Sequence, residues 1–167
     1  MGRAIIFLVV ALLSGCAGYT VGPIPPTYMK GVHKLAVPIF DNKTYEPQIQ
    51  TVVTDTFIKQ LQQDGTYEIT GLDQADAEVH GTVYTVTRVQ ARSVIGNALA
   101  SAQFNLQVQI RLQVINTHTG LTIGQRDVTG QTTFFVGNDL PTQEHQAIPL
   151  AAEDAAVQAA SYLSEGW

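Results

Sequence analysis

The 167-residue chain has one cysteine and few charged residues, 14% in all. One cysteine cannot close an intramolecular disulfide or build a thiolate zinc site, which excludes a disulfide scaffold and a cysteine-based metal site. The basic residues number 9 against 14 acidic ones, whereas a nucleic-acid-binding protein usually has a basic excess. We therefore expect no nucleic-acid partner and a single domain stabilised by its hydrophobic core.

Sequence motifs of catalysis are scarce. The chain has no Gly-rich loop ending in Gly-Lys-Ser/Thr and no Gly-x-Ser-x-Gly element. Its four histidines are not paired at the spacing of a helical metal site, and the sequence has no recognisable nucleophile–base pair. The acidic residues Asp73, Asp76 and Glu78 fall in a polar turn, where we expect solvated carboxylates. We predict a protein that is not an enzyme and that uses no metal or cofactor.

The N-terminus carries a hydrophobic run. Residues 4–13 are apolar and follow Arg3, as in the n-region and h-region of a secretory signal. Ten residues are too few to span a bilayer, which takes about 20. The run ends in the sequence LSGC at residues 13–16, which resembles a bacterial lipobox. This resemblance implies a signal peptide at residues 1–15, cleavage after Gly15, and acylation of Cys16.

The residues that follow Cys16 bear on where the protein is anchored. Several acyl chains hold a protein in a membrane far more firmly than one chain does. By resemblance to lipoprotein sorting rules, Ala17 favours the outer membrane, because the residue that commonly retains lipoproteins in the inner membrane is aspartate. The alternative is an ordinary buried cysteine. Residues 17–27 are rich in proline and glycine, which predicts a lipidated tether at residues 16–31 and a folded domain at residues 32–167.

Hydrophobic periodicity predicts the first half of this domain. Residues 34–40 form an apolar stretch whose Pro38 cannot donate a ladder hydrogen bond, so we expect an edge strand. Apolar residues at helical spacing then predict an amphipathic helix with Pro47 in its first turn and Gly65 at its end. Its apolar face would comprise Ile49, Val52, Val53, Phe57 and Leu61, and its polar face Gln50, Thr54, Asp55, Lys59 and Gln62. A second strand is expected at residues 66–70.

Alternation of apolar and polar residues predicts the remaining strands. Residues 77–92 would place Val79, Gly81, Val83, Val89 and Ala91 on one face, although the middle of this stretch is ambiguous. Residues 104–114 alternate without interruption, which is typical of a half-buried strand. Turn residues 116–120 separate it from a strand at residues 121–135, which predicts an antiparallel hairpin.

After a loop at residues 137–142, a second helix is predicted from Glu144 or Pro149 to Leu163. Its small-residue stripe would allow close packing on a sheet and comprises Ala152, Ala155, Ala156, Ala159, Ala160 and Leu163. The order of elements predicts an α+β fold, with two helices packed on one face of a mostly antiparallel sheet of about four strands.

The arginines of the predicted strands suggest one candidate binding site. Arg88 and Arg92 share a face by their even spacing, and Arg111 lies in the polar register of its own strand. A basic patch of these residues on the face without helices would suit a phosphorylated glycolipid. The alternative is three ordinary solvated arginines. The Asn, Gln and Thr residues of the same face would also suit the hydrated interior of a protein partner.

The ordered motifs of the chain resemble the LptE family of lipopolysaccharide-assembly lipoproteins. The matching features are Cys16 with Gly18-Tyr19, the strand LAVPIF at residues 35–40 leading into Asn42, Thr44, Glu46 and Pro47, then Ala75-Asp76, Gly81 and Tyr84, and an alanine-rich C-terminal helix. The resemblance implies a non-enzymatic outer-membrane lipoprotein. It would plug the LptD β-barrel, help that barrel to assemble, and assist delivery of lipopolysaccharide to the outer leaflet.

A second resemblance leaves other functions open. The strand running into Asn-x-Thr is similar to lipoproteins that activate peptidoglycan synthases or build curli secretion pores. A secretion-pore subunit would need a long membrane-inserting hairpin, and residues 96–102 are too short for one. The main alternative is therefore an outer-membrane lipoprotein that activates a peptidoglycan synthase. A lipid-anchored hydrolase is a third class, and the sequence lacks the residue pair that such an enzyme requires.

Overall fold

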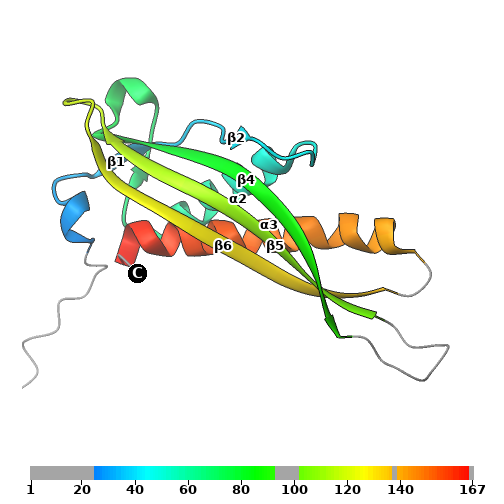
Figure 1. Ribbon diagram of the computed structural model, residues 1–167. Coiled ribbons are helices and arrows are strands. Elements are labelled where there is room, and N and C mark those ends of the chain that lie inside the picture. Colours follow the sequence, from blue (N-terminus) through cyan, green and yellow to red (C-terminus); the bar gives the residue numbers. More distant parts are fainter. Residues whose placement is uncertain (1–24, 93–101, 137–138, 166–167) are drawn as a thin grey trace, which may run out of the picture.

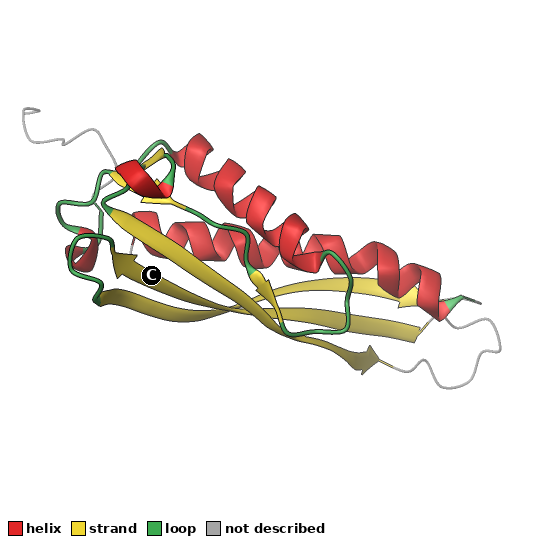
Figure 2. Cartoon of the chain, turned by 90° about the horizontal axis from the view of Figure 1, so that it is seen from above, coloured by secondary structure: helices red, strands yellow, loops and turns green. Residues whose placement is uncertain are grey.

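The computed structural model describes residues 25–92, 102–136 and 139–165 (Figure 1). Two α-helices, α2 (Ile49–Asp64) and α3 (Leu140–Glu165), lie on one side of a sheet, as Figure 2 shows. Two 3₁₀ helices, η1 (Thr27–Met29) and η2 (Leu72–Gln74), lie in the connections. The predicted α+β class with two helices on one face of a sheet is confirmed.

The sheet is mixed and contains six described strands. These are β1 (Lys34–Ala36), β2 (Asp41–Asn42), β3 (Glu68–Ile69), β4 (Ala77–Arg92), β5 (Ala102–Asn116) and β6 (Thr122–Val136). Their order is β3-β1-β4-β5-β6, with β2 also paired to β4. The long strands β4, β5 and β6 are antiparallel, whereas β1 is parallel to β3 and β4, and β2 is parallel to β4. The expectation of about four mostly antiparallel strands is thus only roughly right, because three very short strands add parallel pairs.

The position of β1 corrects one prediction. β1 lies between β3 and β4 and is therefore not an edge strand. It ends at Ala36, before Pro38, so the proline does not interrupt the ladder. Because proline has no N–H to donate to the ladder, the strand ends before Pro38. The chain then crosses over through α2 and returns in parallel strands on both sides of β1.

A bulge in β4 changes which of its side chains face the helices. The register shifts between Val83 and Thr85. Val79 and Val83 are fully buried before the bulge, and Val86 faces the core after it, whereas Val89 is 54% exposed. The prediction that Val89 shares a face with Val79 is therefore wrong, because one extra residue reverses the alternation of the strand.

The core lies between the sheet and the helices. As predicted, β5 alternates, and it contributes five fully buried side chains: Leu106, Val108, Ile110, Leu112 and Val114. The predicted alanine stripe of α3 is also buried. At the closest approach of α3 to β6, a Cβ atom added to Gly130 would lie 2.1 Å from the Ala155 nitrogen and 2.2 Å from the Ala151 carbonyl oxygen. Small residues on both elements therefore allow the helix to pack directly on the sheet.

α2 begins and ends at two residues in the left-handed conformation. It starts at Ile49, after Gln48 with φ 62°, so Pro47 precedes the helix rather than forming its first turn. It ends at Gly65 with φ 73°, as predicted. Thr54 was expected on the polar face but is buried. Its hydroxyl accepts a hydrogen bond from the Phe40 N–H at 3.0 Å, which links the helix to the chain after β1.

α3 is longer than predicted. It starts at Leu140, within the expected loop, and continues through Pro149 to Glu165. The Asp139 carboxylate accepts a hydrogen bond from the Thr142 N–H at 3.2 Å, which caps the start of the helix. A proline inside a helix removes one hydrogen bond without ending this helix, because its buried alanines hold it against the sheet.

The chain before residue 32 is partly packed into the domain. Met29 is fully buried, and the Tyr28 ring stacks on Tyr162 of α3 with the ring centroids 5.3 Å apart. The Tyr28 hydroxyl also donates a hydrogen bond to the Tyr162 carbonyl oxygen at 2.8 Å. Burial, followed by the interaction with the Tyr162 side chain, raises the pKa of Tyr28 well above its usual range. The packed region therefore includes residues before Val32, the expected start of the domain.

Candidate partner-binding surfaces

The side of β4, β5 and β6 opposite α2 and α3 carries no described helix (Figures 1 and 2). We call this side the open face. Cross-strand register brings amide and hydroxyl side chains of the three strands together on it. The polar, uncharged members of the open face include Thr82, Thr85, Thr87, Gln103, Asn105, Gln107, Gln109, Gln113, Gln125, Thr129, Gln131 and Thr133. The open face therefore offers many hydrogen-bonding groups and little net charge.

The charged pair at the centre of the open face is neutral as a unit. Arg111 and Asp127 lie directly opposite each other on β5 and β6. The guanidinium binds the carboxylate in a bidentate manner, with Nε–Oδ1 at 2.8 Å and Nη2–Oδ2 at 2.9 Å. This contact lowers the pKa of Asp127 and raises the pKa of Arg111. The Arg111 guanidinium also lies 5.3 Å from the centre of the Tyr84 ring, which holds it flat on the sheet.

Three amides of the open face, Gln107, Gln109 and Gln131, make no hydrogen bond to another described side chain. The Thr133 hydroxyl donates to the Asn105 side-chain oxygen at 3.0 Å, and the Gln113 and Gln125 amides are 3.5 Å apart. An amide offers two donors and an acceptor, so it can pair with either kind of group on a partner. Two exposed apolar side chains, Val89 and Phe135, lie on the same face near the ends of β4 and β6.

Two of the arginines that were predicted to form one basic patch, Arg88 and Arg111, lie on opposite faces of the sheet. Arg88 lies on the helix side, because the bulge precedes it, and forms an ion pair with Glu144 of α3. Its guanidinium lies 5.6 Å from the centre of the Phe104 ring. Arg111 is on the open face, and the side chain of Arg92 lies outside the described part. The expectation that Arg88 and Arg111 share one basic patch is therefore wrong.

In the acidic turn that contains Asp73, Asp76 and Glu78, one carboxylate, that of Asp76, is bound to the backbone of another segment. The Asp76 carboxylate accepts hydrogen bonds from the backbone N–H groups of His33 and Lys34 at 2.8 and 2.9 Å. These bonds lower the pKa of Asp76 and fasten the start of β4 to the start of β1. Glu78 instead lies 3.0 Å from the His80 ring nitrogen. Within the described ranges, no group of three or more His, Cys, Asp or Glu residues is placed to hold a metal ion.

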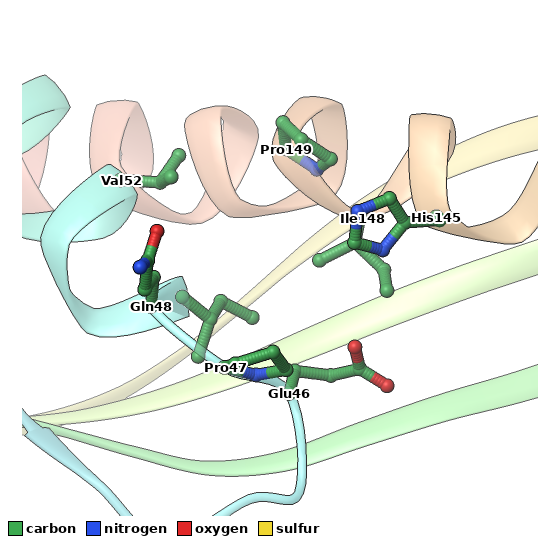
Figure 3. Close-up of a pocket in the computed structure, with 8 residues that line it drawn as sticks. Glu46, Pro47, Gln48, Val52, His145, Ile148 and Pro149 are labelled. Carbon is green, nitrogen blue, oxygen red and sulfur yellow. The ribbon is translucent and has the colours of Figure 1, made fainter.

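A second candidate surface is a cavity of about 370 Å³ between α3 and the chain that enters α2 (Figure 3). We call it the Pro149 pocket. Its lining residues are Glu46, Pro47, Gln48, Ile49, Val52, His145, Ile148 and Pro149. This pocket was not among the predicted sites. Two signals for it were present, the Asn42, Thr44, Glu46 and Pro47 motif and a proline within an alanine-rich helix, but their proximity depends on how the two helices pack.

Two observations bear on membrane attachment. Cys16 and the predicted signal peptide lie outside the described residues. None of the described helices has the length and apolar character needed to cross a bilayer.

The fold and its surfaces define a class of protein: a helix-backed sheet domain with a polar open face and a small pocket lined largely by apolar residues. The family model for LptE, described as lipopolysaccharide-assembly, matches residues 32–163, and the chain belongs to this family. Membership supports a lipoprotein of lipopolysaccharide assembly, and it agrees with the expectation of a non-enzymatic protein.

Solved structures share the fold at low sequence identity. The minor lipoprotein from Acinetobacter baumannii is 16% identical, with a TM-score of 0.52 over 78% of this chain and 91% of that one. The PelC dodecamer from Paraburkholderia phytofirmans is 16% identical, with a TM-score of 0.50 over 79% and 88%. Protein CT253 from Chlamydia trachomatis is 8% identical, with a TM-score of 0.54 over 78% and 97%. No curated protein matches the chain.

Proposed function

We propose that this protein is an outer-membrane lipoprotein that plugs an LptD-like β-barrel, helps the barrel to assemble, and assists lipopolysaccharide delivery to the outer leaflet. Family membership supports the part in lipopolysaccharide assembly. The observation that carries the plug hypothesis is the open face, on which three long strands present amides and hydroxyls around one neutralised ion pair.

The chemistry of the open face suits a hydrated protein interior. Burying an unpaired charge costs far more than burying an amide or a hydroxyl, and a partner can satisfy these neutral groups with its own donors and acceptors or with water. A mostly apolar face would instead favour self-association. The Arg111–Asp127 pair can enter such an interface as a unit, because each charge is already matched.

The proposal includes the lipid anchor. Residues 1–15 would be removed as a signal peptide, and Cys16 would carry the acyl chains. Eight residues lie between Cys16 and Pro25, where the described chain begins, and the nine residue-to-residue steps span at most about 30 Å when fully extended. The stacking of Tyr28 on Tyr162 fixes where this tether leaves the domain, so the anchor would keep that end close to the membrane.

Direct contact with lipopolysaccharide at Arg88, Arg92 or Arg111 is a further part of the proposal. Arg88 and Arg111 are each paired with a carboxylate, so a lipid phosphate would have to displace Glu144 or Asp127. Arg111 is the better placed of these two, because it lies on the open face. Crosslinking of lipopolysaccharide that is unchanged in Arg111→Glu would remove this contact from the proposal.

The test is purification of the acylated chain from its native membrane in mild detergent, followed by mass spectrometry of the bound proteins. Recovery of an LptD-like barrel in near-equal amount is expected. Recovery of a peptidoglycan synthase, or of no partner, would overturn the plug hypothesis. A parallel Cys16→Ala variant should be lost from the outer-membrane fraction, and its normal fractionation there would contradict the lipid anchor.

A further inference from the structure

The loop at residues 42–48, here called the Asn42 loop, is held rigidly by hydrogen bonds. The Asn42 side chain donates to the Glu46 carbonyl oxygen at 2.7 Å and accepts from the Thr44 N–H at 2.8 Å. The Thr44 hydroxyl in turn accepts from the Glu46 N–H at 3.1 Å. The Lys43 N–H donates to the Val83 carbonyl oxygen at 2.8 Å, which fixes the loop to β4. This network holds Glu46 in one place at the mouth of the Pro149 pocket.

The tip of the Asn42 loop presents an aromatic side chain to solvent. Tyr45 is fully exposed and has no described ring contact. A rigid loop loses little conformational entropy when it binds, and tyrosine is enriched among the residues that dominate protein interfaces. These properties favour a protein as the partner of this surface.

The Pro149 pocket beside the loop has an apolar floor. Its volume of about 370 Å³ accommodates a long side chain. The apolar lining residues come from both helices and the loop and are Pro47, Ile49, Val52, Ile148 and Pro149. Figure 3 shows Val52 on α2 facing the turn of α3 that contains Pro149. The floor can therefore cover the methylene stem of an inserted side chain.

Residues that line the Pro149 pocket carry acceptors that an incoming group could bind. The Glu46 carboxylate makes no hydrogen bond or ion pair with another described side chain, and in Figure 3 it extends to the side of the pocket where His145 lies. Pro149 has no N–H, so the His145 carbonyl lacks its usual donor four residues later in the helix. The residues that line the pocket include no lysine or arginine. An occupant with a positive charge and several N–H donors would match this arrangement.

We propose that the Pro149 pocket binds a lysine or arginine side chain of a protein partner. The stem of that side chain packs on the apolar floor, and its cationic head binds the Glu46 carboxylate and the His145 carbonyl oxygen. Tyr45 contacts the partner's surface next to the inserted residue. This docking site lies apart from the open face.

The first test uses n-butylguanidinium, which mimics an arginine side chain, and the full acylated chain in detergent. NMR is expected to show saturable shifts of the Val52 and Ile148 methyl groups. Glu46→Gln should weaken the binding about tenfold, since a charge-assisted hydrogen bond is lost. Glu153→Gln, on an exposed position of α3 outside the pocket, should leave it unchanged. Absence of shifts, or equal affinity in Glu46→Gln, would overturn the proposal.

The second test identifies the occupant in cells by means of a photo-crosslinking residue at Val52. A crosslinked peptide that contains lysine or arginine at the attachment site is expected, and Glu46→Lys should abolish it while Glu153→Lys does not. A crosslink to lipid, or one that persists in Glu46→Lys, would contradict a basic protein side chain as the occupant. If the wild-type chain still recovers an LptD-like barrel, such a result would refute the pocket alone and leave the proposed function standing.

Discussion

The two faces of the sheet are formed by the same three strands yet differ in almost every physical property. In β5, the even-numbered residues from Leu106 to Val114 are fully buried beneath the helices, whereas the odd-numbered residues between them are amides and one arginine on the open face. Alternation with a period of two thus lets one strand serve the core with half of its residues and a binding surface with the other half.

The difference between the faces is also one of energy. A fully buried aliphatic side chain contributes about 1.5–3 kcal/mol to folding, whereas exposed polar side chains contribute little. Substitutions on the open face can therefore alter binding without loss of the fold. Substitutions on the covered face should act on stability first, which allows the two roles to be separated by experiment.

The largest expected effect comes from truncating the covered face. Leu112→Ala should lower the free energy of unfolding by about 3–4 kcal/mol, because it leaves a cavity beneath the helices. Its neighbour Gln113 points to the open face, and Gln113→Ala should change the free energy by less than about 0.5 kcal/mol. Urea denaturation of both variants measures the contrast. Equal losses would show that the open face also supports the fold.

The contact between α3 and β6 should be the next most sensitive. Gly130→Ala places a methyl group against the backbone of Ala151 and Ala155 and should cost about 2–3 kcal/mol. Thr129→Val, on the exposed side of the same strand, serves as the control and should stay within about 0.5 kcal/mol. A wild-type unfolding midpoint for Gly130→Ala would mean that the helix does not pack this closely on the sheet.

A smaller effect is expected where a carboxylate joins backbone segments. Hydrogen bonding lowers the folded-state pKa of Asp76 below its unfolded value of about 3.9, so its stabilising contribution is present above that pH and is lost as the pH falls through the folded-state pKa. Asp76→Asn should cost about 1 kcal/mol at pH 7. Unfolding curves collected from pH 7 to pH 3 should show a difference in the free energy of unfolding that is constant at first and shrinks once the pH falls below about 3.9. A gap that stays constant with pH would rule out this explanation.

The smallest effect is predicted for the ion pair of the open face. Arg111 and Asp127 are both about half exposed, and exposed pairs contribute little to stability. Asp127→Asn should therefore change the free energy of unfolding by less than about 0.5 kcal/mol. The same variant leaves Arg111 uncompensated on the open face, so recovery of the partner should fall while thermal unfolding stays unchanged. A loss of stability without loss of the partner would reverse the roles assigned to this pair.

The elements that could be predicted from the sequence are those with one-sided burial over many residues. Hydrophobic periodicity predicted the alternation of β5 and the alanine stripe of α3. Turn and cap residues predicted the hairpin from β5 to β6 and the end of α2 at Gly65. The short parallel strands were less visible, because β2 and β3 have two residues each and acquire their partners through tertiary packing.

The candidate binding surfaces were predicted only in part. The polar character of the open face follows from β5 alone, whereas the positions of the arginines depend on the bulge after Val83. The alternation is ambiguous there, and it does not show which residue is the extra one. Because of this bulge, Arg88 lies on the face covered by the helices and not on the predicted open face. The Pro149 pocket could not be predicted, because it forms where Glu46 and Pro149, about a hundred residues apart in the chain, meet between two helices.

The most direct measurement of the central claim compares charge added to the open face with the same charge added elsewhere. Gln107→Lys with Thr129→Lys modifies the open face, and Gln62→Lys with Gln63→Lys is the matched control at exposed positions of α2. Both variants would be purified from native membranes in mild detergent, and the bound barrel would be quantified after unfolding curves confirm that both are folded. The account predicts loss of the LptD-like barrel from the open-face variant alone. Equal recovery of the barrel with both variants would contradict it.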